Sequence, residues 1–142
     1  MPKILIVEDE ENLRELYAED LEESGFDVEK AINGKEAMDL VRKGGFDLVI
    51  MDIRMPEMDG ITFLKAVRQQ SVDIPFILFT GRGREEVVIE AINNGVDFYI
   101  QKGGDPKAQF AELTHKIQKA VSRRRADLSR IESEKRLADI IN

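Results

Sequence analysis

Five short apolar runs alternate with longer segments in which apolar residues recur every three or four positions, and this alternation restricts the fold more than any other feature. Short runs suit strands, whereas the longer periodicity is typical of amphipathic helices. Successive strand–helix units predict a parallel sheet with helices on both faces, because right-handed crossovers must return over the sheet. The expected strands cover residues 4–7, 26–31, 48–51, 75–79 and 98–100.

Local signals mark several expected helix ends. Asn33 followed by Glu36 predicts a capped helix start, and the Gly44-Gly45 pair is expected to end that helix. Pro106 suits the first turn of the last helix, because its missing N–H would have no partner inside the helix there.

Composition and charge exclude several classes of protein. The chain has 142 residues, enough for one domain with an appendage, and no cysteine for disulfides or thiolate metal sites. The net charge of −7 is uneven, with +4 in residues 106–142 and −11 in the rest, and an acidic body argues against direct nucleic-acid binding. The apolar runs are too short to span a bilayer and no signal peptide opens the sequence, so we expect a cytoplasmic protein without membrane contact.

Charged and hydroxyl side chains follow four of the expected strands, at the point where each strand ends. Glu8 and Asp9 follow the first strand, Asp52 the third, Thr80 the fourth and Lys102 the fifth. In an open parallel sheet these positions share the carboxyl edge, where ligands bind. Clustered carboxylates without His or Cys favour a hard cation with oxygen ligands, above all Mg²⁺. The sequence therefore predicts a magnesium site at this edge.

The same groups suit phosphoryl transfer. A carboxylate can attack phosphorus and form an aspartyl phosphate. The transition state spreads negative charge over three oxygens, so a metal ion and an ammonium group would supply the compensating positive charge. A threonine hydroxyl can donate a hydrogen bond to the phosphoryl group once it is in place.

Four motifs spread over residues 3 to about 120 resemble the receiver domain of two-component response regulators, the class of the chemotaxis response regulator. The resemblance implies a flavodoxin-like, doubly wound α/β fold of five strand–helix units, with a five-stranded parallel sheet in the order 2-1-3-4-5. The motifs are Ile4-Leu5-Ile6-Val7-Glu8-Asp9, Asp47-Leu48-Val49-Ile50-Met51-Asp52-Ile53-Arg54-Met55-Pro56-Glu57-Met58-Asp59-Gly60, Pro75-Phe76-Ile77-Leu78-Phe79-Thr80-Gly81 and Phe98-Tyr99-Ile100-Gln101-Lys102.

The resemblance assigns chemical roles to the positions that match these motifs. Asp52 is the expected phosphoacceptor and would receive its phosphoryl group from a histidine kinase. Asp9 is expected to ligate Mg²⁺ directly and Glu8 through water. Asp52 and the backbone carbonyl of Arg54 are expected to be further ligands. Lys102 is expected to pair with the phosphoryl group. The domain would be a signalling phosphoacceptor that assists only its own phosphorylation and dephosphorylation, and not an enzyme.

The resemblance also implies a switch that responds to the new phosphoryl group. Thr80 is expected to move toward it and vacate space, which Tyr99 turns inward to fill. The face formed by the helix ending near Asn94, the strand of residues 98–100 and the last helix then changes shape. The expected partners are a downstream protein or a covalently linked output domain, and a second copy of the chain that dimerises through this face or through the last helix.

Two loops depart from the family pattern. Lys102 is followed by Gly103-Gly104 instead of the proline that is common in the family, so the usual cis peptide is not assumed and a looser loop is expected. Arg82 and Arg84 lie in a glycine-containing loop after Thr80. A solvated loop is the simpler interpretation, and contact of one arginine with the phosphoryl group or a partner is the alternative.

The C-terminal segment is longer than the last helix of a receiver needs to be. The sequence predicts a receiver domain at residues 1–122, with residues 123–142 as a helical extension or linker that leads to an output or sensor domain outside this sequence. The run of three arginines at 123–125 is expected to be the solvated end of the domain. The extension is either a frayed helix or a coiled-coil linker. The residues expected to pack on the sheet are Phe110, Leu113, Ile117 and Val121.

Two other functions compete with the phosphoacceptor. A phosphorylation-independent, protein-binding adaptor with the same fold is the main alternative, although loss of Asp52, Lys102 or the acidic pair would have favoured it and none is lost. A Mg²⁺-dependent phosphohydrolase ranks last. Such enzymes typically carry a second acid two residues after the nucleophile, where this chain has Arg54.

Overall fold

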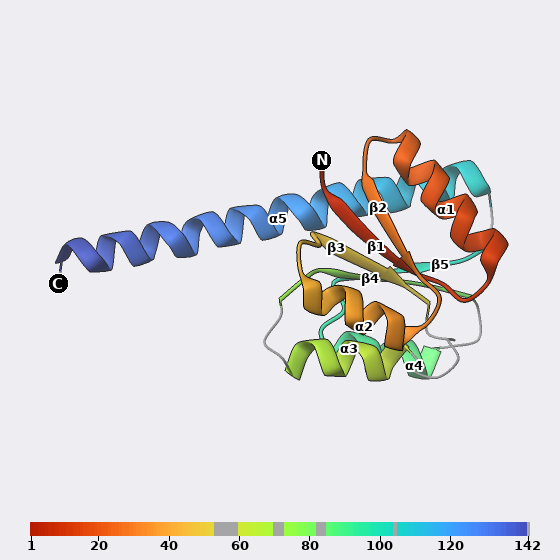
Figure 1. Ribbon diagram of the computed structural model, residues 1–142, viewed down its shortest axis with the longest axis horizontal. Coiled ribbons are helices and arrows are strands. Elements are labelled where there is room, and N and C mark those ends of the chain that lie inside the picture. Colours follow the sequence, from red (N-terminus) through yellow and green to blue (C-terminus); the bar gives the residue numbers. More distant parts are fainter. Residues whose placement is uncertain (53–59, 70–72, 82–84, 104, 142) are drawn as a thin grey trace.

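The computed structural model describes residues 1–52, 60–69, 73–81, 85–103 and 105–141. Within these residues five strands and five helices alternate along the chain (Figure 1). Their bounds are β1 (Lys3–Val7), α1 (Glu11–Glu23), β2 (Asp27–Ala31), α2 (Gly34–Lys43), β3 (Leu48–Met51), α3 (Gly60–Gln69), β4 (Phe76–Thr80), α4 (Glu85–Asn93), β5 (Phe98–Gln101) and α5 (Pro106–Ile141).

The strands form one parallel sheet in the order β2-β1-β3-β4-β5, which confirms the flavodoxin-like fold and the strand order that the resemblance implied. β1 lies between β2 and β3, and Val7, at its end, pairs with Ala31 and Met51. The ends of β1 and β3 therefore coincide. The residues that follow them, Glu8 and Asp52, leave the sheet at the same edge.

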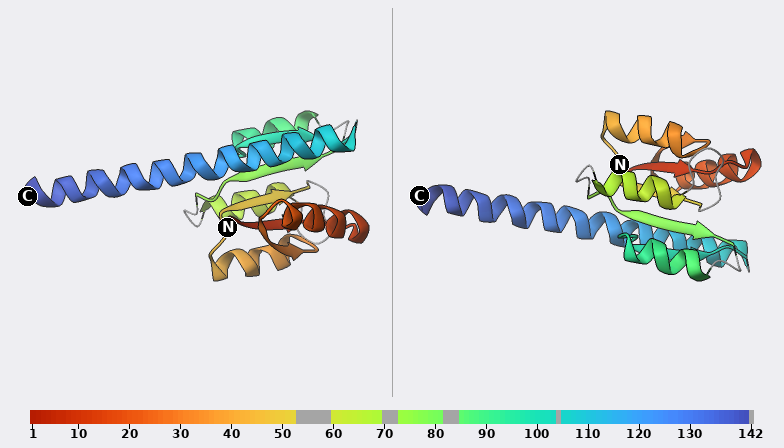
Figure 2. Two further views of the ribbon diagram at one scale, coloured as in Figure 1. Left: turned by 90° about the horizontal axis from the view of Figure 1, so that it is seen from above. Right: turned by 90° about the horizontal axis from the view of Figure 1, so that it is seen from below.

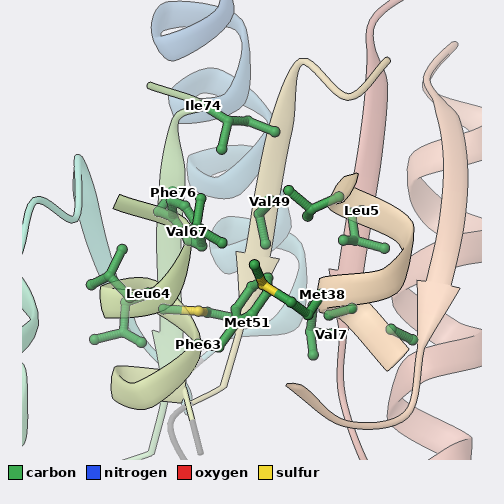
Figure 3. Packing of buried hydrophobic residues seen from close by; sticks show 14 of the residues in the cluster. Leu5, Val7, Met38, Val49, Met51, Phe63, Leu64, Val67, Ile74 and Phe76 are labelled. Carbon is green, nitrogen blue, oxygen red and sulfur yellow. The ribbon is translucent and has the colours of Figure 1, made fainter. Parts of the chain in front are cut away.

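Helices cover both faces of the sheet, as the strand–helix alternation predicts (Figures 1 and 2). One core cluster joins the sheet to α1 and α5 and includes Leu21 and Ile117. The other joins the opposite face to α2, α3 and α4, where Met38 and Phe63 pack with residues of β1 and β3 (Figure 3). All four residues of the central strand β3 are buried, because helices cover it on both sides.

The two expected helix signals around α2 are both used. The side chain of Asn33 accepts a hydrogen bond of 2.8 Å from the backbone N–H of Glu36, so it satisfies one of the donors left free at a helix start. The helix ends at Gly44, whose φ of 80° lies in the left-handed region that glycine adopts without strain. These two local signals therefore mark the start and the end of α2 as expected.

The last helix continues far beyond the sheet. α5 is one element over Pro106–Ile141, about 54 Å long at 1.5 Å per residue, and its second half projects away from the body (Figures 1 and 2). Leu113, Ile117 and Val121 are buried against the sheet as expected, and Phe110 is partly buried. Beyond Val121 the large apolar side chains are exposed, for example Leu128 at 45% and Ile131 at 52%. None of the described helices is long and apolar enough to cross a membrane.

One expectation about this helix was wrong. Arg124 was expected at a solvated domain end, but its Nη1 donates a hydrogen bond of 3.0 Å to the carbonyl of Phe46, and Nη2 lies 3.7 Å from a carboxylate oxygen of Asp73. The neighbouring residues Arg123 and Arg125 are exposed. Helical geometry turns only the middle arginine toward the body, so the contact between α5 and the body extends past residue 122.

Candidate functional site

The site lies where β1, β3 and β5 end. The backbone N–H of Glu8 donates to the carbonyl of Ala31 at 3.1 Å, and that of Asp52 donates to the carbonyl of Val7 at 3.3 Å. These bonds continue the sheet ladder by one residue and hold the backbone that carries both acids. Lys102 follows β5, two strands away from Asp52 in the sheet.

The structure brings together three of the side chains predicted from sequence. Lys102 Nζ lies 2.8 Å from Asp52 Oδ2 and 3.5 Å from Glu8 Oε1. The three side chains are 19%, 14% and 5% exposed, respectively, so they meet in a largely water-excluded position. A shielded ammonium in contact with two carboxylates interacts more strongly than an exposed ion pair would. The triad is therefore an electrostatic unit made from residues 94 positions apart.

Burial dominates the electrostatics of Glu8. Loss of solvent raises the pKa of Glu8 to about 7, although the charge of Lys102 acts in the opposite direction. The negative charges of Asp52 and Asp9 raise this pKa further. The raised pKa of Glu8 is therefore mainly an effect of burial, and the neighbouring carboxylates add to it.

The pKa of Lys102 is determined by two opposing effects. Burial alone would lower it, but the hydrogen bond and charge of Asp52, together with the charge of Glu8, leave the pKa above its ordinary value. Lys102 is therefore a fixed cation near neutral pH. Its Nζ also lies 5.6 Å from the centroid of the Phe79 ring, and the same ring makes an edge-on contact with Tyr17 at 5.1 Å.

Glu8 begins an acidic run at residues 8–11, and the next two acids, Asp9 and Glu10, have different surroundings from Glu8. Asp9 is exposed. Glu10 caps α1, because its carboxylate accepts hydrogen bonds from the N–H groups of Asn12 at 3.2 Å and Leu13 at 2.8 Å. Arg14 Nη1 donates to the backbone carbonyl of Glu8 at 3.0 Å, which brings a positive charge beside the run. The run thus combines a buried acid, an exposed acid and a helix cap.

Three predicted site residues are less fully described. Thr80 ends β4 and pairs with Gln101 in the sheet, while the position of its side chain lies outside the described part of the structure. Tyr99 is half-buried in β5 and packs against the core cluster that contains the α4 residues Val88 and Ala91. Arg54 lies outside the described residues, as do Arg82 and Arg84.

The donor set at this edge suits a hard cation. Glu8, Asp9 and Asp52 offer only carboxylate oxygens, the ligands that Mg²⁺ prefers, and a divalent ion would compensate the negative charges that raise the pKa of Glu8. Among the described residues, however, no group of three or more acidic or histidine side chains is arranged to hold a metal ion. The positive charge that lies next to Asp52 and Glu8 in this structure is the ammonium group of Lys102.

Sequence reasoning missed residues that support the triad. Arg14 gave no motif signal, because its role depends on helical geometry that returns it to the carbonyl of Glu8. Gln109 contacts the loop around Lys102, with bonds to the carbonyls of Gln101 and Gly103. Its position one turn into α5, after Pro106, is the only sequence signal that could have indicated it.

Comparison with known proteins agrees with this geometry. Residues 4–118 match the response regulator receiver domain. The chain is 33% identical over 139 residues to the transcriptional regulatory protein SrrA of Staphylococcus aureus, a match that covers 98% of this chain and 55% of the relative. The chain therefore spans about half the length of this relative.

Solved structures give the same result. The receiver domain of the Francisella response regulator 1452 superposes with a TM-score of 0.78 at 30% identity, covering 87% of this chain and 98% of that one. The response regulator TrrA of Thermotoga maritima, solved in complex with Mg²⁺-BeF, superposes with a TM-score of 0.74 at 35% identity, covering 84% and 99%. With the sheet order, the triad and these similarities agreeing, the chain belongs to the response regulator receiver domain family, a family of two-component signal transduction.

Proposed function

We propose that this receiver accepts a phosphoryl group on Asp52 from a histidine kinase. The single observation that supports this most strongly is the contact of 2.8 Å between Lys102 Nζ and Asp52 Oδ2, in a position shielded from water. An ammonium group held there is ready to compensate the charge of a phosphoryl group on the same carboxylate. The match of residues 4–118 to the receiver family supports the same role.

In the proposed reaction a carboxylate oxygen of Asp52 attacks phosphorus, and the bond between phosphorus and the donor breaks as the new oxygen–phosphorus bond forms. Lys102 then pairs with the phosphoryl oxygens. Glu8, Asp9, Asp52 and the backbone carbonyl of Arg54 would hold Mg²⁺, which supplies positive charge at the same oxygens. The burial of Glu8, Asp52 and Lys102 limits the access of water.

We further propose that the signal leaves the site through Thr80 and Tyr99. Tyr99 packs against the cluster that includes the α4 residues Val88 and Ala91, so a rotation of its ring would change the packing under α4. The proposed output surface is the face formed by α4, β5 and α5. A homodimer through this face or through the end of α5 is part of the proposal.

The proposed division of the chain is a receiver at residues 1–122 and an extension at residues 123–142 that leads to a covalently linked output domain or meets a downstream protein. The greater length of the relative SrrA supports a further domain. The relative is a transcriptional regulatory protein. Direct nucleic-acid contact by the receiver itself is not proposed, because its body is acidic.

The test is the intact mass of the protein after incubation with Mg²⁺ and a small acyl-phosphate donor. The parent chain should gain one phosphoryl group, and Asp52→Asn should gain none. Asp39→Asn, which removes an exposed carboxylate on α2, is the matched control and should behave like the parent. If the folded parent gains nothing from this donor or from histidine-kinase phosphodonors, the adaptor function replaces the phosphoacceptor.

A further inference from the structure

The loop that carries Lys102 has little conformational restraint of its own. Gly103 follows directly, is exposed and has a φ of 111°, a conformation that residues with a side chain rarely adopt. A Cβ atom added at Gly103 would meet nothing within 4 Å, so the space on that side of the residue is open. Yet Lys102 Nζ is held at 2.8 Å from Asp52. The contacts of Nζ with Asp52 and Glu8 hold only the end of the side chain, so the backbone of the lysine needs a further contact if it is to be restrained as well.

Gln109 supplies that contact. Its Nε2 donates a hydrogen bond of 2.6 Å to the carbonyl of Gln101 and one of 3.1 Å to the carbonyl of Gly103. These two carbonyls flank Lys102 in the chain. One amide group carries two N–H donors, so it can satisfy both carbonyls at once, and only its nitrogen can face two acceptors. The side chain therefore bridges the backbone on both sides of the lysine.

We propose that Gln109 is a positioning residue that clamps the loop and thereby aims Lys102 at Asp52. The proposal rests on the phosphoryl-binding role proposed above for Lys102. Two adjacent features hold the lysine in complementary ways. Gln109 fixes its backbone, and the ring of Phe79, 5.6 Å from Nζ, borders the path of its side chain.

The clamp is itself firmly placed by the start of α5. The side-chain carboxylate of Asp105 accepts a hydrogen bond of 3.2 Å from the backbone N–H of Ala108. The backbone carbonyl of Asp105 accepts one of 3.0 Å from the backbone N–H of Gln109. This capped first turn orients Gln109 toward the loop. Gln109 is half-buried and lines, with Tyr17 and Phe110, a groove of about 220 Å³ between α1 and α5. A residue placed in this way loses little entropy when it forms the two bonds.

The test uses two substitutions and a matched pair of controls. Gln109→Ala removes the donor without adding charge, and Gln109→Glu keeps the shape but presents acceptors to the two carbonyls. Gln118→Ala and Gln118→Glu make the same changes at an exposed position on the same helix. The first readout needs no metal and is the amide hydrogen-exchange rate of Lys102 and Gly103. The second is the affinity for beryllofluoride, a phosphoryl mimic, at saturating Mg²⁺. The third is the affinity for Mg²⁺ alone.

Both Gln109 variants should accelerate exchange at Lys102 and Gly103 about tenfold and weaken beryllofluoride binding about tenfold, because two hydrogen bonds are lost. Their Mg²⁺ affinity should stay within about twofold of the parent, since the acids after β1 keep their positions, whereas general destabilisation would not produce this separation. Both Gln118 variants should match the parent in all three readouts.

Exchange rates and beryllofluoride affinity that are the same for Gln109→Ala and Gln118→Ala would overturn the clamp. A loss seen only with Gln109→Glu would also overturn it, because added charge and not a lost donor would then be the cause. If the parent itself does not bind beryllofluoride, the proposed phosphoacceptor function fails, whereas the metal-free exchange rates still decide whether Gln109 restrains the loop.

Discussion

At the scale of single residues, Glu8 and Lys102 show how burial changes the properties of ordinary side chains. The residues next to each of them, acids after Glu8 and glycines after Lys102, are also compatible with a solvated surface loop. In the structure Glu8 is 4% exposed, and its pKa rises to about 7. Lys102 keeps its charge because Asp52 and Glu8 outweigh the effect of burial on its pKa. The charge of Lys102 therefore lowers the pKa of Glu8, and the charge of Glu8 raises the pKa of Lys102.

The raised pKa of Glu8 predicts a pH-dependent stability. The folded state binds this proton more tightly than the unfolded state, so the contribution is fully present below about pH 4.5 and is lost as the pH rises through 7. Glu8→Gln cannot ionise and should stabilise the metal-free domain by about 3 kcal/mol at about pH 8, with no gain at about pH 4. Urea unfolding in EDTA across this range measures it. Glu19→Gln, at an exposed site, should show no such trend, and a pH-independent effect of Glu8→Gln would contradict the prediction.

Addition of Mg²⁺ should stabilise the parent domain at neutral pH, because a cation that binds only the folded state shifts the unfolding equilibrium. At a free concentration about 100 times Kd, the free energy of unfolding should rise by about 2.7 kcal/mol, and EDTA should reverse the change. Asp9→Asn should reduce the increase, while Asp39→Asn keeps it. Thermal unfolding with and without the metal is the measurement. An equal increase in Asp9→Asn and the parent would place the ion elsewhere.

At the scale of elements, α5 contacts two regions that lie far apart in the sequence, the loop around Lys102 and the segment before β3. Gln109, near the start of the helix, contacts the loop around Lys102. Arg124, further along the helix, donates a hydrogen bond to the carbonyl of Phe46, just before β3. Phe46, whose carbonyl receives that bond, is itself buried in the core, and the next residue, Asp47, is bonded to Lys3 at the start of β1. α5 is therefore hydrogen-bonded to the body at both ends of the parallel strands, near Lys102 after β5 and at Phe46 before β3.

Removal of the Arg124 contact should destabilise the domain. Arg124→Ala leaves the carbonyl of Phe46 without its partner and should cost about 1–3 kcal/mol of unfolding free energy. The ion pair with Asp73 adds little to this value, because Asp73 is 74% exposed. Arg125→Ala removes an exposed arginine from the next position and should change stability by less than about 0.5 kcal/mol. Urea titration compares the two, and equal effects would show that the contact with Phe46 contributes nothing.

At the scale of the whole molecule, a body of three layers, with the sheet between two layers of helices, carries a helix whose second half projects away from it (Figures 1 and 2). The body contains both core clusters, and Val121 is the last residue of α5 that is buried among those whose burial the structure describes. Leu137 is 58% exposed, so the extension adds little to the stability of the body. Its apolar side chains are available for contacts with other chains or domains.

Truncation separates the two parts. A chain that ends at residue 126 keeps Val121 and Arg124 and should unfold within about 0.5 kcal/mol of the full chain. A chain that ends at residue 116 loses Ile117, Ala120 and Val121 from the core and should be destabilised by about 3 kcal/mol or more. Denaturant titration of both truncations is the measurement. A large loss in the longer one would mean that the extension supports the body.

The fold class and the carboxyl edge at which Glu8, Asp52 and Lys102 gather could be predicted from the residue pattern, and the strand order followed from the family resemblance. Periodicity and strand ends are local properties of the chain, and a parallel sheet places successive strand ends at one edge. Which side chains touch depends instead on the three-dimensional packing. Gln109 and Arg124 carry no distinguishing pattern, and the exposed Arg123 and Arg125 flank Arg124. Their contacts depend on how α5 is rotated against the sheet, which core packing fixes over many residues at once.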